Sequence, residues 1–365
     1  MRDLTASLAR LILVRLRRDE RGVIAALVAV LIGSGVLLGM GALVIDVAQI
    51  YQEHAELQNG ADAAALGVAK SCALGACAPD VATQLADGNA SSLTGGTEGV
   101  TLVCGSGSLG GCPGSAGSLT NCPPQPPAGT NFAEVYTATQ TASGSRLLPP
   151  VFATSLMGSG YQGTTVRACA QVEWGAPPAA TADALTISAC EWDEATDQGT
   201  EYASARPVAS VDQVLAFDPG DDTTGCATEP AGADNPGTFG WAADVTGSCT
   251  LPVSGSSFPA GTGPSVSAAC QQVLQNSQRN QTPILVPIYV SYDASGTFDL
   301  RGFADFVVTG YNLQAGFSAA DWLNPANTCQ GTDYCLTGYF VRGVIPATGS
   351  LAGTYLGASV IDLTG

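Results

Sequence analysis

His54 is the only histidine among the 365 residues, so it is the first candidate for acid–base chemistry. A Ser-His-Asp or Cys-His mechanism needs its histidine within hydrogen-bond reach of a nucleophile in a pocket. His54 instead falls on the apolar face of a predicted helix, in DVAQIYQEHAELQNGADAAALGVAK. The GxSxG nucleophile motif is also missing from the sequence. We therefore predict no catalytic residue, and we expect His54 to be a polar residue that sets helix register.

The segment GSGSLG (105–110) matches the GxGxxG pattern of dinucleotide-binding turns and follows a strand-like VTLV. In those sites a helix begins directly after the turn, and its N-terminus holds the pyrophosphate. Here the next residues are GCPGSAGS, which cannot open a helix. We interpret GSGSLG as a flexible loop and predict no cofactor.

Two acidic loops are candidates for calcium, because carboxylates on a short loop can surround a hard cation. Neither has EF-hand spacing, and acidic turns are common on acidic surfaces. The sequence DASGT is similar to the DxSxS metal site of von Willebrand A domains, but only about seventy residues follow it, too few for that fold's other ligands. We predict no metal, and calcium binding stays an alternative. The loop residues are Asp218, Asp221 and Asp222 in FDPGDDTTG, and Asp293 and Asp299 in YDASGTFD.

All twelve cysteines lie at or beyond position 72. An even number confined to one part of the chain indicates disulfides in an oxidising compartment. Zinc is the alternative, but no CxxC spacing occurs and histidine is nearly absent. Proximity in sequence suggests two pairs, Cys226 with Cys249 and Cys329 with Cys335.

The segment from Val23 to Ile45 contains 23 residues without a charge. At about 1.5 Å per residue, such a helix is roughly 35 Å long, enough to cross a hydrocarbon core of about 30 Å. A secretory signal has a shorter apolar region, about 7–15 residues. We therefore predict a single-pass transmembrane helix at 23–45.

Basic residues concentrate before this apolar run, which predicts a cytoplasmic N-terminus and an extracellular C-terminal domain in the cell membrane. The segment 1–22 is then a cytoplasmic basic segment, either an amphipathic helix on the inner leaflet or a disordered topology signal. The basic residues are Arg2, Arg10, Arg15, Arg17, Arg18 and Arg21, against Asp3, Asp19 and Glu20.

The helical pattern continues beyond the apolar run as a stalk helix at 46–70. Its apolar positions follow a strict three–four spacing, which predicts packing against a partner helix or against the chain's own domain. Within the apolar run, a GxxxG pair favours close approach of two helices and lateral self-association. The predicted interface residues are Gly35, Gly39, Val47, Ile50, His54, Leu57, Ala61, Ala64 and Val68.

The rest of the chain, 71–365, is rich in Gly, Ser, Pro and Cys and contains several β-prone segments. The clearest strands are TTVRACAQVEW, PILVPIYVSYD, FADFVVTGYNLQ and YCLTGYFVRGVIP, and SVSAACQQVLQNSQ predicts a short helix. APPAATAD is expected to be a linker or an edge crossing. The fold class is therefore α+β: a transmembrane and stalk helix followed by a β-rich, disulfide-stapled extracellular domain.

Net charge excludes one class of partner. Residues 47–365 carry 7 basic and 27 acidic residues, a net charge of −20. Such a surface repels the phosphate backbone, so we predict no nucleic-acid partner.

The N-terminal segment resembles a known family. Glu20-Arg21-Gly22, the apolar run, Val44-Ile45-Asp46-Val47-Ala48, Tyr51 and LQNGADAAAL (57–66) follow the pattern of TadG-like proteins of Flp (tight-adherence, Tad) pilus assembly. The resemblance covers residues 20–70. Pilins of this class are cut after a glycine and carry a glutamate five residues later, whereas Gly22 is followed at that spacing by Leu27. This departure favours a permanent anchor.

The resemblance implies a non-enzymatic, membrane-anchored minor pilin-like or accessory component of a Flp/Tad pilus or secretion system, acting in assembly, anchoring or adhesion. Its implied partners are membrane lipid and other pilin-like or Tad components. Two alternatives stay open. One is an anchored extracellular ligand-binding or metal-dependent domain, such as the von Willebrand A domain of some relatives. The other is a general cell-envelope protein that shares only the anchor helix.

Overall fold

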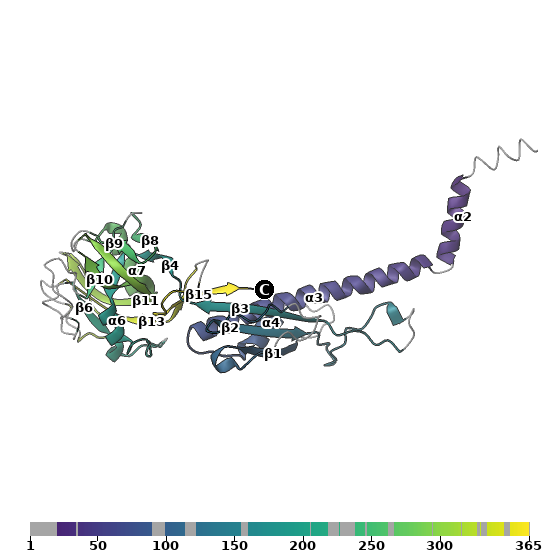
Figure 1. Cartoon of the computed structure of the whole chain (residues 1–365), viewed down its shortest axis with the longest axis horizontal. Coiled ribbons are helices and arrows are strands. Elements are labelled where there is room, and N and C mark those ends of the chain that lie inside the picture. Colours follow the sequence, from purple (N-terminus) through teal and green to yellow (C-terminus); the bar gives the residue numbers. More distant parts are fainter. Residues whose placement is uncertain are drawn as a thin grey trace, which may run out of the picture. The chain divides into compact units, whose positions relative to one another are not determined.

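The structure is a computed structural model of the whole chain (Figure 1). It describes residues 20–33, 36–89, 99–113, 122–154, 160–204, 206–217, 226, 238–244, 247–261, 266–293, 295–314, 316–326, 329, 334–346 and 351–364. Helices and strands both occur, and the strands concentrate after residue 98. The predicted combination of helices with a β-rich, disulfide-bonded remainder is confirmed.

The chain forms two compact units. Unit 1 comprises Met1–Ala61, Thr83–Thr101 and Tyr136–Cys169, and unit 2 comprises Asp62–Ala82, Leu102–Val135 and Ala170–Gly365. The boundary runs through helix α3 and through the first three strands, so both units are built from non-contiguous segments.

The N-terminal helices are α2 (Glu20–Gly33) and α3 (Val36–Ala73). No helix among the described residues is both long enough and apolar enough to cross a membrane. The predicted single transmembrane helix at 23–45 is therefore not supported: the apolar run is divided between α2 and α3, and residues 34 and 35 lie outside the described part of the chain.

A five-stranded sheet has the order β1-β2-β3-β15-β14. The predicted strand at 164–174 is present as β3. Helix α4 (Val81–Asn89) precedes this sheet. The strands are β1 (Gly99–Gly105), β2 (Asn131–Ala138), β3 (Arg167–Gly175), β14 (Gly343–Val344) and β15 (Ala358–Leu363).

Unit 2 contains an eight-stranded sheet whose main path is β6-β13-β11-β10-β5-β7, with β9 and β12 paired to β11. Its centre is the antiparallel pair β10 and β11, and β5 joins β10 in parallel. The strands are β5 (Leu185–Ser188), β6 (Gln213–Ala216), β7 (Phe239–Trp241), β9 (Ser257–Pro259), β10 (Ile284–Asp293), β11 (Thr297–Gln314), β12 (Phe317–Ala319) and β13 (Cys335–Val341).

Apolar side chains cover both faces of this sheet. Phe306 and Ile288 belong to one buried cluster, and Phe303 and Tyr289 belong to a second. Burial on both faces explains why the first seven residues of β10, ILVPIYV, form a continuous apolar run rather than an alternating pattern. The sheet therefore forms the core of unit 2.

Helices α6, α7 and η2 and a two-stranded ribbon also belong to unit 2. Ser188 and Ser267 cap α6 and α7 through their side-chain oxygens, which accept from backbone N–H groups inside the first turn. The expected linker APPAATAD is wrong in part, because its second half forms β4. The elements are α6 (Ala189–Ala195), α7 (Ala268–Asn280), the short 3-10 helix η2 (Ala209–Val211), and the ribbon of β4 (Ala179–Asp183) with β8 (Thr250–Ser254).

All twelve cysteines are disulfide-bonded. Cys329 is joined to Cys335, whereas the predicted Cys226–Cys249 pair is wrong. Cys226 bonds Cys190 on α6, and Cys249 bonds Cys270 in the first turn of α7. In both pairs one partner lies on a helix, α6 or α7, and the other lies outside the α-helices and strands. Two further disulfides are Cys72–Cys77 and Cys104–Cys112.

A pair of buried carboxylates in unit 2 has an unfavourable electrostatic environment. Asp183 accepts a hydrogen bond from the backbone N–H of Leu285 at 3.0 Å, and Leu285 lies opposite Asp305 in the β10–β11 register. Burial raises the pKa of Asp183 to about 6. Burial, reinforced by the Asp183 charge, raises the pKa of Asp305 to about 7. The Oδ2 atom of Asp305 has no hydrogen-bond partner.

This pair predicts that unit 2 loses stability as pH rises from about 4 to about 7. In that window the folded state holds protons that the unfolded state, with carboxyl pKa values near 3.9, has released. Asp305→Asn should flatten the slope and raise the free energy of unfolding at pH 8 by on the order of 2 kcal/mol. Denaturant melts at several pH values measure both effects. The exposed control Glu201→Gln should behave like the parent; an unchanged slope in Asp305→Asn would contradict the prediction.

Candidate functional site

Helix α3 turns one face toward unit 1. Leu57 is fully buried and packs with Leu148, Val166 and Ala168, and the partly buried Ile50 joins this cluster. The backbone oxygen of Leu57 accepts a hydrogen bond from Thr137 Oγ1 at 3.0 Å. The part of α3 from Asp62 onward lies in unit 2. Of the predicted interface residues, Leu57, Ala61, Ala64 and Val68 are fully buried in the chain's own fold.

Two members of the predicted seam do not lie on the buried face. Val47 is 41% exposed and His54 is half-buried, whereas Asp46 and Glu53 are more than nine-tenths buried. The three–four spacing is right, but the buried positions at this end are shifted by one residue. The reason is that apolar periodicity counts a carboxylate as polar and assigns it to solvent, even where it has partners inside the fold.

The Asp46 carboxylate is held by three consecutive backbone N–H groups. Val151 N donates to Oδ1 at 2.8 Å, Phe152 N donates to Oδ1 at 3.0 Å, and Ala153 N donates to Oδ2. Such charge-assisted bonds compensate for the cost of removing a carboxylate from water. Asp46 therefore fastens the segment 151–153, more than a hundred residues away in sequence, to helix α3.

Glu53, the second buried carboxylate of α3, has a different environment. Burial raises its pKa above the usual range, interaction with the Thr139 side chain opposes this shift, and the neighbouring Glu56 carboxylate adds to it. Glu53 thus favours its protonated form more than an exposed glutamate does.

A second face of α3, adjacent to the buried one, is apolar and exposed. Met40, Val44, Val47 and Tyr51 recur at spacings of four, three and four, so they lie on one side of the helix. Tyr51 is 74% exposed. We call these four residues the outer stripe. An uninterrupted apolar stripe on a surface helix indicates contact with something outside the chain.

The predicted GxxxG contact is only partly described. Gly39 is half-buried, and Gly35 lies outside the described residues. A helix–helix contact at these glycines therefore stays a prediction.

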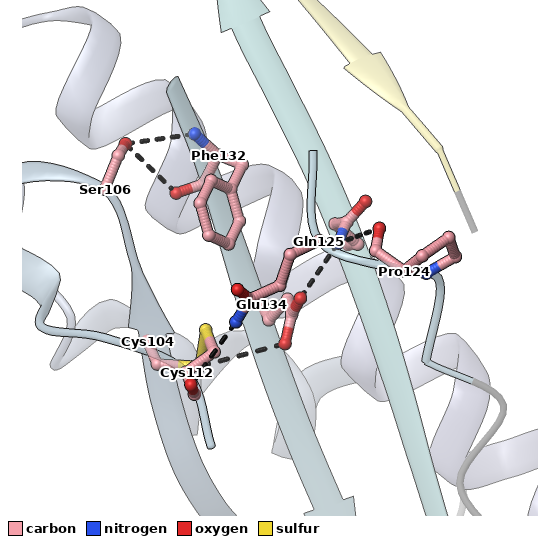
Figure 2. Close-up of a disulfide and its surroundings, with 8 residues drawn as sticks. Cys104, Ser106, Cys112, Pro124, Gln125, Phe132 and Glu134 are labelled. Carbon is pink, nitrogen blue, oxygen red and sulfur yellow. Dashed lines mark hydrogen bonds between the residues drawn. A yellow bond between two sulfur atoms is a disulfide. The ribbon is translucent and has the colours of Figure 1, made fainter. Parts of the chain in front are cut away.

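A buried carboxylate also lies next to the GSGSLG loop (Figure 2). Glu134 Oε1 accepts from Gln171 Nε2 at 2.8 Å, and Thr364 Oγ1 donates to Gln171 Oε1 at 3.0 Å. The Cys104 and Cys112 sulfurs lie within 4.8 Å of the Glu134 carboxylate. Because these sulfurs are in a disulfide, they offer no thiolate to a metal.

The Cys104–Cys112 disulfide spans GSGSLG, which contains the short 3-10 helix η1 (Gly107–Leu109). Gly105 N donates to Gly110 O at 2.8 Å. Phe132 N donates to Ser106 Oγ at 3.0 Å (Figure 2). Gly105 has a φ of +156°, and a Cβ there would collide with the Phe132 carbonyl. The expectation of a flexible loop is therefore wrong: its glycines serve a disulfide-closed turn.

The acidic loop at 293–299 is used inside a hairpin. Asp293 Oδ1 accepts from the backbone N–H groups of Ser295 and Thr297, and these bonds together with the Ser295 hydroxyl lower the pKa of Asp293. Asp299 accepts from Ser291 Oγ on the paired strand. The DASGT segment is thus the β10–β11 turn. Asp218, Asp221 and Asp222 lie outside the described residues.

A groove of about 830 Å³ in unit 2 is lined in part by Trp174, Arg342 and Tyr355. The Arg342 guanidinium also lies 4.6 Å from the ring centre of Tyr202. None of the residues that the sequence analysis proposed for an interface, a metal site or catalysis lines this groove.

The N-terminal half of α3 therefore combines a docked inner face, a buried carboxylate clamp and an exposed apolar stripe. Residues 22–71 match the family model of putative Flp pilus-assembly TadE/G-like proteins. The predicted TadG-like segment at 20–70 is thereby confirmed. No curated protein and no solved structure significantly matches the chain. The matched segment covers most of α2 and of α3, including the outer stripe and the buried carboxylates Asp46 and Glu53.

Sequence reasoning missed Asp46, Glu53 and Glu134 as buried groups. For Asp46 a signal was available, because it is the charge that ends the uncharged run and belongs to the family-like VIDVA motif. For Glu134 and Glu53 the sequence offered none.

Removing the Asp46 carboxylate should release segment 151–153. Asp46→Ala leaves three N–H groups without their acceptor, and each charge-assisted bond is worth about 1.5–3 kcal/mol. We expect hydrogen exchange at the Val151, Phe152 and Ala153 amides to accelerate by about tenfold or more, since about 1.4 kcal/mol corresponds to a factor of ten.

Gln52→Ala is the matched control, because Gln52 is exposed on the same helix and bonds only Glu56 within the described contacts. Its exchange pattern at 151–153 should equal the parent's. Equal protection of these three amides in Asp46→Ala would show that the clamp does not hold the segment.

Proposed function

We propose that this chain is a non-enzymatic, membrane-associated accessory or minor pilin-like component of a Flp/Tad pilus-assembly system. The TadE/G-like segment at 22–71 supports a pilus-related role. The single observation that carries the finer proposal is the division of α3 into two faces. Its inner face completes the chain's own fold, and its outer stripe is left for lipid or for a neighbouring helix.

Exposed apolar side chains are concentrated in α2 and the first part of α3, within the segment that matches the family model. Large exposed side chains follow one another from Val23 to Tyr51. A soluble surface rarely carries a continuous patch of this kind, because water disfavours it. We propose that this segment anchors the chain in the cell membrane and contacts other pilin-like components, with the disulfide-bonded remainder outside the cell. Twelve disulfide-bonded cysteines support an oxidising compartment.

The non-enzymatic part of the proposal rests on the candidate residues. Among the described residues, no hydrogen bond connects His54 on α3 to a nucleophile. Asp293 and Asp299 take part in the hydrogen bonds of a hairpin. The strongest candidates for chemistry thus have structural roles.

Polar substitution of the outer stripe tests the proposal. Val44→Gln combined with Val47→Gln should leave the fold intact, because both side chains are exposed, and should reduce both carbonate-resistant membrane association and co-isolation with pilus components. Immunoprecipitation of the full-length chain from cells that make the pilus gives the second readout.

Two comparisons make the result specific. Gln52→Ala should retain parental co-isolation. Leu57→Ala should lower the free energy of unfolding by about 2–5 kcal/mol, because it leaves a cavity in the unit 1 cluster. Parental co-isolation of the stripe variant would refute a role of this face in assembly.

A further inference from the structure

The loop that Asp46 holds carries exposed apolar side chains of its own. Val151 is 53% exposed and Phe152 is 42% exposed, and Leu147 is exposed beside them. We infer that residues 146–152, here called the lipid loop, are a second membrane contact that rests in the headgroup region of an anionic bilayer beside α3. This inference rests on the proposed membrane association and adds to it a site on the β2–β3 connection.

The lipid loop is built to hold its apolar side chains outward. Leu148 is the member of the loop that points inward: it is 3% exposed and packs against Leu57. Leu148 and Thr164 exchange backbone hydrogen bonds of 2.7 and 3.3 Å. Pro149 and Pro150 restrict the backbone between this anchor and the Asp46 clamp. Exposure of Val151 and Phe152 is thus fixed by contacts on both sides.

Asp46 determines the position of the lipid loop along the axis of α3. It directly follows Ile45, the last residue of the uncharged run, so the N–H groups it binds lie where that run ends. In a membrane-associated chain this is the boundary between hydrocarbon and headgroups. Tyr51, just over one turn further along the outer stripe, is an aromatic residue of the kind that gathers at this boundary.

The combination of a basic residue with exposed apolar side chains favours lipid. The 38 residues from 135 to 172 contain no Asp or Glu and include Arg146 and Arg167, in a chain with a net charge of −18. Arg146 is exposed and immediately precedes Leu147. A basic residue next to exposed aliphatic and aromatic side chains matches an anionic headgroup layer above acyl chains.

The test places a fluorescent reporter at the tip of the lipid loop. The full-length chain carrying Phe152→Trp is bound to vesicles of phosphatidylcholine and phosphatidylglycerol whose acyl chains are brominated. We expect the emission added by this tryptophan, relative to the parent, to be quenched. Val208→Trp, at an exposed position in unit 2, is the control, and its added emission should not be quenched.

Two further measurements connect the result to the structure. In the Asp46→Ala, Phe152→Trp double variant, lipid quenching should be lost although the chain still floats with the vesicles. Replacing phosphatidylglycerol by phosphatidylcholine should weaken quenching of Phe152→Trp, because Arg146 loses its anionic partner.

Each contrary result has a distinct meaning. If the protein binds vesicles but aqueous iodide quenches the added emission of Phe152→Trp as strongly as that of the control, the lipid loop alone is refuted. Shielding from iodide without quenching by brominated lipid assigns the loop to a protein partner and also refutes the inference. Failure of the parental chain to associate with any vesicle refutes the proposed membrane association itself.

Discussion

The clamp between Asp46 and the N–H groups of residues 151–153 is the interaction on which the organisation of unit 1 depends. A carboxylate in the middle of a helix is costly to bury, and an apolar residue there would be cheaper for helix packing alone. An apolar residue, however, cannot form directional hydrogen bonds. Three N–H groups converging on two oxygens determine where the β2–β3 connection meets α3, and with it which side of the helix remains uncovered.

Three buried carboxylates illustrate three electrostatic solutions. Asp46 is surrounded by backbone donors, and Glu134 is bonded by the Gln171 amide. Asp305 has an unpartnered oxygen and a second carboxylate nearby, and its pKa is raised to about 7. In an acidic chain with few cations, backbone and amide N–H groups are the donors most available for charge compensation. Where none is in reach, protonation is the remaining way to neutralise the group.

The sequence predicted the positions of helices and strands better than it predicted the contacts between residues distant in sequence. The three–four spacing of α3 and the β-branched runs of β10 and β11 are local signals, and the helix and strands occur where those signals lie. Burial of Asp46 and the pairing of Cys226 with Cys190 depend on residues distant in sequence. No local pattern encodes such partners. The GSGSLG turn makes the same point, because Gly105 satisfies a steric requirement set by Phe132 on another strand.

The two faces of α3 separate folding from the proposed assembly contacts. Leu57 and Ala61 are fully buried, so substitutions there change the stability of the fold first. The outer stripe makes no such contribution, since its side chains are already exposed in the folded chain. Substitutions on that stripe should therefore change the proposed contacts outside the chain without unfolding the domain. Asp46 couples the two faces. Its inward-facing carboxylate fixes the lipid loop and thereby determines how much apolar side-chain surface the chain exposes there.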